Sequence, residues 1–204
     1  MPRVKGVKEK LHLPIYDAFF VPGQNGQPAK KFGDAMTDPR MIRFFVDVQN
    51  KTKLETNLQA SGVLPSLNTF EARAMRVVVS SLREQARAPE QPQEQQREAN
   101  FLAELIYNSV TTLLVGEKVM IEMPTFWFPA GAGVTGQFLG VVFNHGDPDP
   151  LATFRFAEPV LIEPQQSFRV EMLFPQGLPN EVKNAIGPLR VWVVLDGYLT
   201  RDVQ

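Results

Sequence analysis

The sequence predicts an all-β protein, a two-sheet antiparallel sandwich, and three observations lead to that expectation. The C-terminal segment alternates, with apolar side chains at Leu189, Val191, Val193 and Leu195, the period of a strand with one buried face. About eight to ten strand-like segments recur along the chain, the number found in a two-sheet sandwich. The 17 prolines and 14 glycines among the 204 residues suit short strands divided by turns. We therefore expect a sandwich with one short inserted helix and an extended N-terminal arm.

Residues 1–40 form the expected arm, and residues 41–204 form the expected sandwich domain. The tip of the arm is basic, and apolar side chains follow it, interrupted by Pro14 and Pro22: Leu11, Leu13, Ile15, Phe19, Phe20 and Val21. This segment lacks the periodicity to fold alone, so it should become ordered either on its own domain or on a neighbouring subunit. Deleting residues 1–21 should then leave a folded sandwich and weaken assembly.

The body of the sandwich is predicted from short β-rich segments bounded by turn residues. Gly116-Glu117 separates two of them as a hairpin turn, and Asp196-Gly197 is interpreted as a second tight turn within a closing hairpin. The expected strands cover residues 42–48, 69–80, 109–115, 118–123, 138–143, 152–156, 160–162, 167–174, 189–195 and 198–200.

One helix is predicted, as an insertion over about residues 93–108. Pro89 and Pro92 exclude an earlier start, and the apolar stripe that follows has helical spacing: Phe101, Leu102, Leu105 and Ile106. We expect this helix to cap one end of the sandwich.

Composition argues against several functional classes. The chain has no cysteine, which excludes disulfides, thiol nucleophiles and cysteine-bound zinc. Its net charge of −1 gives no general attraction to nucleic acid. No apolar stretch approaches the roughly 18 residues of a membrane-spanning helix.

Catalytic and metal-binding signals are weak. Residues 131–136 match the spacing of a dinucleotide-binding glycine loop, but prolines precede them and a strand-like segment follows. The two histidines are His12 and His145, and His145 lies in a turn with Asp147 and Asp149. A solvated turn explains that cluster better than a calcium site. We expect no enzyme activity, no catalytic residue, no cofactor and no metal ion.

Consecutive aromatic residues are the best candidates for intermolecular contact. In an extended segment, Phe126 and Phe128 would face one way and Trp127 the other, so one side should join the core and the other an oligomer interface. Together with Phe19 and Phe20 of the arm, Phe126, Trp127 and Phe128 are the predicted interface residues. A carbohydrate platform made of Trp127, Trp192 and Tyr198 is the alternative use of exposed aromatics.

Five stretches, in order, resemble a group of small structural proteins from tailed and other icosahedral bacteriophages. They are NLQASGVLPSLNTFEARAMRV at 57–77, LLVGEK at 113–118, FWFPAGAG at 126–133, FAEPVLIEPQQSFRV at 156–170 and PLRVWVVLDGYLTRDVQ at 188–204. The resemblance lies in these short stretches of sequence and in their order along the chain. It implies a sandwich of jelly-roll type that is made in the host cytoplasm and assembles in the capsid of the virion.

Two roles in a capsid shell follow from that resemblance. The first is a cement or decoration protein that stabilises capsomers of another capsid protein. The apolar arm favours this role, and we expect a homo-oligomer with a trimer favoured. The second is a single-jelly-roll coat protein that tiles the shell itself. A carbohydrate-binding or host-attachment module is the further alternative, and weak contact of the basic arm with packaged nucleic acid stays open.

Overall fold

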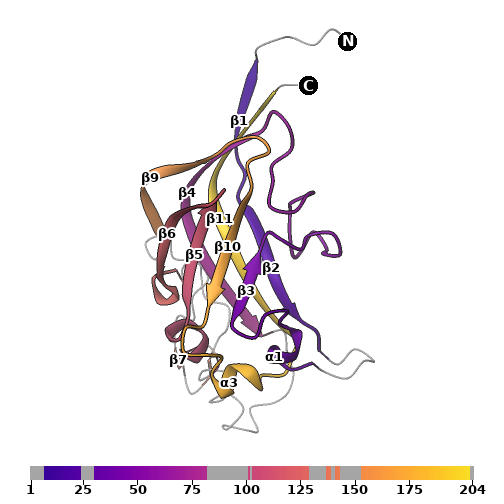
Figure 1. Ribbon diagram of the computed structural model, residues 1–204, viewed down its shortest axis with the longest axis vertical. Coiled ribbons are helices and arrows are strands. Elements are labelled where there is room, and N and C mark those ends of the chain that lie inside the picture. The colour runs from indigo at the N-terminus through magenta and orange to yellow at the C-terminus, as the bar shows by residue number, and fades with distance from the viewer. Residues whose placement is uncertain are drawn as a thin grey trace.

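Two antiparallel β-sheets packed face to face make up the body of the protein in the computed structural model (Figure 1). The structure describes residues 7–23, 30–81, 101, 103–128, 137–138, 141–142 and 153–202. One sheet contains β1 (Lys8–His12), β2 (Ile15–Val21), β4 (Thr69–Ser81), β9 (Phe154–Ile162) and β11 (Leu189–Asp202). The other contains β3 (Met41–Phe44), β5 (Val110–Val115), β6 (Lys118–Pro124) and β10 (Phe168–Leu173). The predicted all-β sandwich is confirmed.

The strand order is that of a jelly roll. In the five-stranded sheet, β2 and β1 pair in succession with β11, which is followed by β4 and β9; the other sheet runs β3-β10-β5-β6. Along the chain, β2, β4, β9 and β11 alternate with strands of the opposite sheet, so the connections cross repeatedly between the layers. This arrangement buries one face of each sheet against the other.

Alternation along the strands supplies the core. On β10, Phe168, Val170 and Met172 are buried, while the residues between them are more exposed. Fully buried side chains from both sheets and their connections meet between the layers: Phe32, Phe44, Phe70, Met75, Leu113, Ile162, Phe174 and Leu195. The many phenylalanines provide large apolar area without a polar tip that would need a partner.

The expected closing hairpin is wrong, because β11 continues through Asp196-Gly197 without a turn. Its inward positions stay in register past this dipeptide, and Leu199 is also buried. A bulge in β4 accompanies Gly197, where a Cβ would lie 2.1 Å from the carbonyl oxygen of Glu71. An Asp-Gly pair forms a hairpin only when its two flanking segments pair with each other; here both flanks pair with β4.

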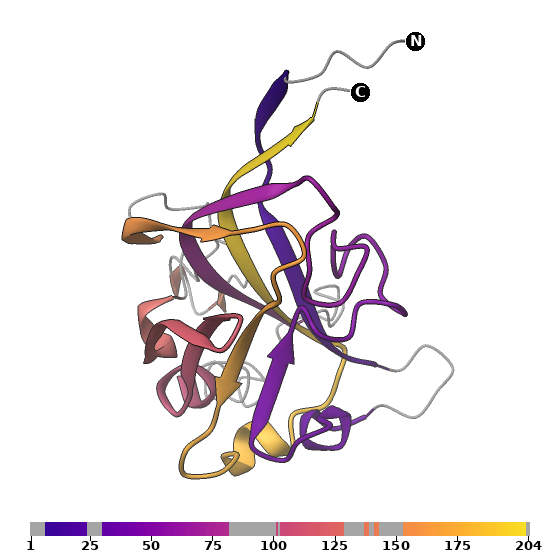
Figure 2. The ribbon, with the colours of Figure 1, turned by 45° about the horizontal axis from the view of Figure 1, so that its top comes forward.

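The described part of the arm lies on its own sandwich, which decides between the two sequence-based alternatives. β2 pairs with β11 from Ile15↔Leu195 to Val21↔Leu189, and β1 pairs with the end of β11. These segments are strands of the main sheet. β1 and the end of β11 consequently project side by side as a two-stranded ribbon (Figure 2).

A buried ion pair connects β2 to the segment after β3. Asp17 is fully buried, and its carboxylate accepts hydrogen bonds from the Phe45 backbone N–H at 2.7 Å and from Lys51 Nζ at 2.7 and 2.9 Å. Burial raises the pKa of Asp17, and the attraction of Lys51 opposes that increase. Because an unpartnered charge would be costly there, Lys51 and the Phe45 N–H secure this edge of the sandwich.

Several element boundaries differ from the sequence-based expectations. β3 ends at Phe44 because Phe45 has a φ of 69°, a conformation outside the strand region. The two segments expected at 152–156 and 160–162 form one irregular strand, β9. The strand expected at 138–143 is instead a pair of short strands, β7 (Gln137–Phe138) and β8 (Val141–Val142).

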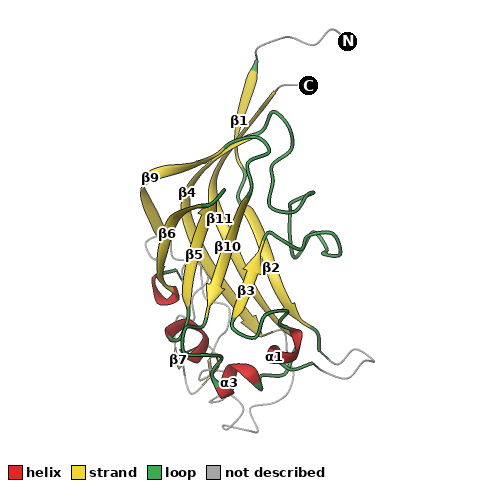
Figure 3. Cartoon of the chain, in the orientation of Figure 1, coloured by secondary structure: helices red, strands yellow, loops and turns green. Residues whose placement is uncertain are grey.

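Helical segments gather at the end of the sandwich opposite the termini (Figure 3). Phe101 and residues 103–107 are helical, as predicted, and Phe101 and Leu105 are buried by the core. Asn108 is in a turn, and residues 93–100 and 102 of the predicted helix lie outside the described residues. Two short helices were not anticipated, α1 (Phe32–Ala35) and α3 (Asn180–Lys183). Within the described part of the chain, no helix is long and apolar enough to span a membrane.

Candidate interaction surface

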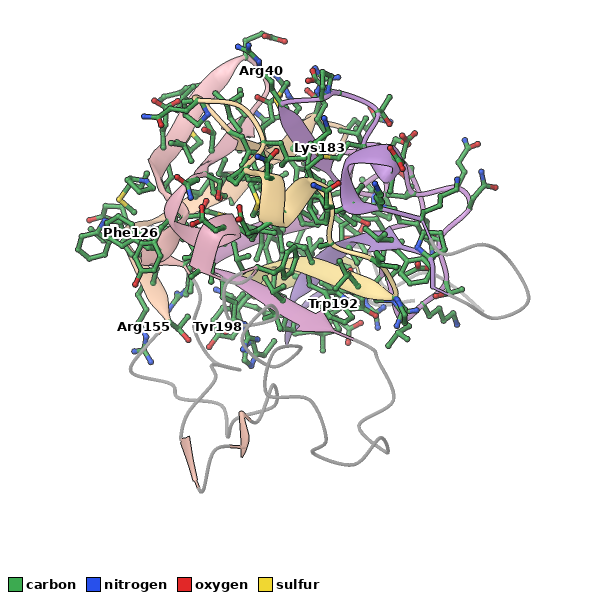
Figure 4. All side chains as sticks on the ribbon, turned by 90° about the horizontal axis from the view of Figure 1, so that it is seen from below. Arg40, Phe126, Arg155, Lys183, Trp192 and Tyr198 are labelled. Carbon is green, nitrogen blue, oxygen red and sulfur yellow. The ribbon has the colours of Figure 1, made fainter. Side chains whose placement is uncertain are left out.

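Three exposed aromatic rings lie together beside the β5–β6 hairpin, and we call them the aromatic stack: Tyr107, Phe126 and Trp127. Their relative exposures are 71%, 45% and 54%, respectively. The Phe126 ring stacks on Tyr107 at a centroid distance of 6.0 Å and on Trp127 at 5.7 Å, with interplanar angles of 28° and 29°. Phe126 projects from the side of the molecule in Figure 4.

The local backbone explains why two adjacent aromatic side chains are both exposed. Thr125–Trp127 form a short 3₁₀ helix, η1, directly after β6. In a helical turn, neighbouring side chains do not alternate between opposite faces as they do in a strand. The extended arrangement expected for Phe126-Trp127-Phe128 is therefore wrong.

A buried group of hydroxyls holds η1 in place. Thr125 Oγ1 is 2.7 Å from both Ser109 Oγ and Thr111 Oγ1, and Ser109 Oγ donates to the Leu105 carbonyl at 2.6 Å. The Thr125 backbone N–H also donates to the Ser109 carbonyl at 2.9 Å. Ser109, Thr111 and Thr125 are buried, so these bonds are shielded from water and orient the base of the stack.

Phe128 attaches the same turn to the five-stranded sheet. Its side chain is completely buried and contacts Phe154 edge to face at 5.3 Å, while its carbonyl accepts from the Val77 N–H at 2.9 Å. Phe128 is thus a core residue within the described structure, and Phe126 and Trp127 stand on a turn that is fixed from both sheets.

The geometry of the aromatic stack suits contact with a protein surface. In a stack, each ring covers part of the face of its neighbour, whereas a carbohydrate platform needs ring faces that lie side by side and open to solvent. Exposed aromatics held in one position lose little conformational entropy on contact and commonly dominate protein interfaces. The stack therefore offers a rigid apolar contact.

The other predicted interface and platform residues lie elsewhere. Phe19 is half-buried and packs edge to face on Phe32 at 5.2 Å, whereas Phe20 lies beneath the Arg190 guanidinium at 4.6 Å. Trp192 and Tyr198 lie on a different side from Phe126 (Figure 4). The structure therefore does not bring Trp127, Trp192 and Tyr198 together as one carbohydrate platform.

Tyr107 is the member of the stack that sequence reasoning missed. It follows the apolar stripe of the predicted helix but falls outside it, which was the available signal for an exposed aromatic. Its partnership with Phe126 depends on the turn that joins the helix to β5, and the side-chain spacing carries no information about that turn.

A second cluster, rich in charge, lies where β1, β11 and β4 meet. Lys10 Nζ is 2.6 Å from Glu71, and His12 Nε2 is 2.8 Å from Asp196 Oδ1. Hydrogen bonds from Lys10 and Arg73 lower the pKa of Glu71 from its ordinary value of 4.5. Among the described residues, no group of three or more His, Cys, Asp or Glu side chains is arranged to hold a metal ion.

The predicted histidine and glycine-loop features are only partly placed. His12 joins β1 to Asp196 on β11. His145, its neighbouring aspartates and the glycine-rich segment at 131–136 lie outside the described residues.

Comparison with known proteins gives no assignment: no family model, no curated protein and no solved structure matches this chain. Its function is therefore argued from the fold, the exposed surface and the sequence.

Proposed function

We propose that this protein is a structural protein of a bacteriophage virion and assembles in the icosahedral capsid shell. The role that fits best is a cement or decoration protein that stabilises capsomers through contacts between subunits. The observation that carries the proposal is the aromatic stack, a fixed apolar surface on a jelly-roll sandwich. The family resemblance of the sequence supplies the biological setting.

The fold supports this proposal without specifying it. Jelly rolls occur in capsid proteins and also in lectins and enzymes, so function has to be argued from the surface. Phe126 and Trp127 expose apolar area next to Tyr107, and burial of such area drives association. A specific contact would bury roughly 800 Å² on each partner, so neighbouring residues must contribute as well.

A single-jelly-roll coat protein is the second candidate, and the strand order favours it. The two sheets, β2-β11-β4-β9 and β3-β10-β5-β6, form a complete jelly roll. Such a block could tile a shell alone, with the aromatic stack at the contact between copies.

The proposal is tested by the mass of the full-length protein in solution. We expect light scattering after size exclusion, well above micromolar concentration, to give a closed oligomer, with a trimer favoured. Replacing Phe126 and Trp127 together by serine should produce monomers, because the exposed contact is lost while the buried Phe128 remains. Leu54→Ser is the matched control, since this leucine is also exposed, at 59%.

The outcomes separate the two candidate roles from other functions. Shell-sized particles that disappear in the Phe126→Ser/Trp127→Ser variant would identify a coat protein. A monomeric wild type, or a wild type and a double variant with the same oligomer, would contradict assembly through the aromatic stack. Circular dichroism spectra of the variants establish that any change in mass is not a loss of fold.

A further inference from the structure

The outward face of the five-stranded sheet carries arginines that lack carboxylate partners. On β11, the residues between the inward-facing ones point outward, including Arg190 and Trp192. The register places Arg76 of β4 opposite Val194 and Arg155 of β9 opposite Ala74, both on this face. Arg155, Trp192 and Tyr198 follow the same side of the molecule in Figure 4.

Two of these arginines lack a hydrogen-bond partner at a buried nitrogen. Within the described structure, Arg76 Nε and Arg190 Nε are buried side-chain nitrogens without a hydrogen-bond partner. A buried donor nitrogen without an acceptor is energetically costly. Anionic groups placed against each of the two side chains would supply acceptors.

Two acidic groups of this face are already engaged. Glu71 pairs with Lys10 and Arg73, and Asp196 accepts from His12. Across the described residues, no ion pair involves Arg76, Arg155 or Arg190. The face therefore retains a line of positive charge even though the net charge of the chain is −1.

The register gives the dimensions of this line. Arg76 and Arg190 are four residues apart along the paired strands, which corresponds to about 13 Å at roughly 3.3 Å per residue. Arg155 lies level with Ala74, two residues or about 7 Å beyond Arg76 on the side away from Arg190. The line thus extends about 20 Å and crosses three strands, so one small anion cannot reach every member, whereas a polyanion with closely spaced charges can.

The aromatic side chains on this face determine how such a polyanion could bind. Arg190 covers Phe20 at 4.6 Å and approaches Trp192 at 6.0 Å. Lys10 and Arg73 lie 4.9 and 5.0 Å from the Tyr198 ring. Because cations of the same chain cover these rings, they are poorly placed to stack on bases.

We propose that this outward face binds the phosphodiester backbone of nucleic acid without sequence preference. The bound groups are phosphates, which match the hydrogen-bonding fork of arginine. This inference is independent of the proposed oligomer, because none of the three arginines belongs to the aromatic stack.

The test is fluorescence anisotropy with the full-length protein and labelled 20-nucleotide single strands, one of thymidine alone and one of mixed sequence. We expect both to bind with similar affinity, in the range of about 10⁻⁴ to 10⁻⁶ M at physiological salt. Replacing Arg76, Arg155 and Arg190 together by glutamine should weaken binding at least tenfold. It should also reduce the slope of log affinity against log salt by about 2, since each lost phosphate contact contributes about 0.7.

Matched variants separate this face from the general charge of the protein. Arg43→Gln/Arg169→Gln alters the other sheet, where both side chains lie near Glu171, and should leave affinity within twofold of wild type. In a protein whose Arg3 and Lys5 are replaced by glutamine, replacing Arg76, Arg155 and Arg190 should still weaken binding and lower the salt slope by the full amount. If the triple variant is unfolded by circular dichroism, the exposed Arg155→Gln alone should still lower the slope by about 0.7.

Any of these results would overturn this inference: no binding by wild type, equal loss in the Arg43/Arg169 control, complete loss through Arg3 and Lys5, or strong preference for one strand. Tighter binding of a polyglutamate peptide than of either strand would assign the face to an acidic protein and would also refute it. None of these results depends on the mass in solution, so failure here is distinguishable from failure of the assembly proposal.

Discussion

Phe126 and Phe128 are separated by one residue and have opposite environments. Phe126 is exposed on the aromatic stack, and Phe128 is enclosed by the core. The difference arises from η1, which turns the backbone between β6 and the five-stranded sheet. At the residue scale, stability and association are therefore assigned to neighbouring side chains of the same type.

This separation predicts opposite effects for the same substitution. Phe128→Ala should lower the free energy of unfolding by about 3–5 kcal/mol, because it leaves a cavity in the core. Phe126→Ala should lower it by less than about 1 kcal/mol, because only an exposed ring contact is lost. Urea unfolding of both variants measures the two values, and similar losses would contradict the division of roles.

At the element scale, the sequence predicted strands best where one pattern continued without interruption. The alternation from Leu189 and the hairpin around Gly116 both correspond to observed strands. The Asp196-Gly197 dipeptide was misleading because turn preference is local, whereas pairing with β4 extends across it. Competition between a local signal and long-range pairing cannot be resolved from the dipeptide alone.

The candidate surface could be predicted only in part for a related reason. Adjacent aromatics indicated an exposed contact, and Phe126 and Trp127 are indeed exposed. Tyr107 joins them only because the helix, η1 and the buried hydroxyls between them meet in space. Likewise, the arginine line depends on the register among three strands.

Attachment of β1 to the sheet should depend on pH through Glu71. Because its folded-state pKa is lowered from 4.5, the stabilising contribution of this carboxylate is present above pH 4.5 and is lost as the pH falls through the lower folded value. We expect amide exchange in β1 to accelerate, relative to β2, as the pH falls from 4.5 through the lower folded pKa of Glu71, after correction for the intrinsic rate.

Lys10→Met provides the control for that prediction. This substitution removes one hydrogen bond to Glu71, so a carboxyl titration followed by NMR should show a higher pKa for Glu71 than in wild type. An unchanged titration would show that Lys10 does not stabilise the ionised carboxylate.

At the scale of the whole molecule, the structure changes the expected outcome of N-terminal deletion. Residues 1–21 include β2, which contributes the buried Ile15, Asp17, Ala18 and Val21. Removing them should unfold the sandwich, contrary to the expectation for a separate arm. Removing residues 1–12 takes away β1 alone and should leave a cooperative unfolding transition.

Circular dichroism and thermal melting of the two truncated chains test this revision. A folded chain lacking residues 1–21 would mean that β2 is dispensable despite its pairing with β11. Loss of structure in the chain lacking residues 1–12 would instead mean that β1 is needed for the sandwich.

The ribbon formed by β1 and the end of β11 has a mechanical consequence. Lys8 lies opposite Asp202, and the paired residues continue inward to His12 and Tyr198. Inter-strand hydrogen bonds in an antiparallel pair run across the strands, so a tension that pulls these two ends apart loads the bonds one after another. Under such a force, the ribbon would peel open before the sandwich yields. A force applied along the strands would load the same bonds in parallel and meet much greater resistance.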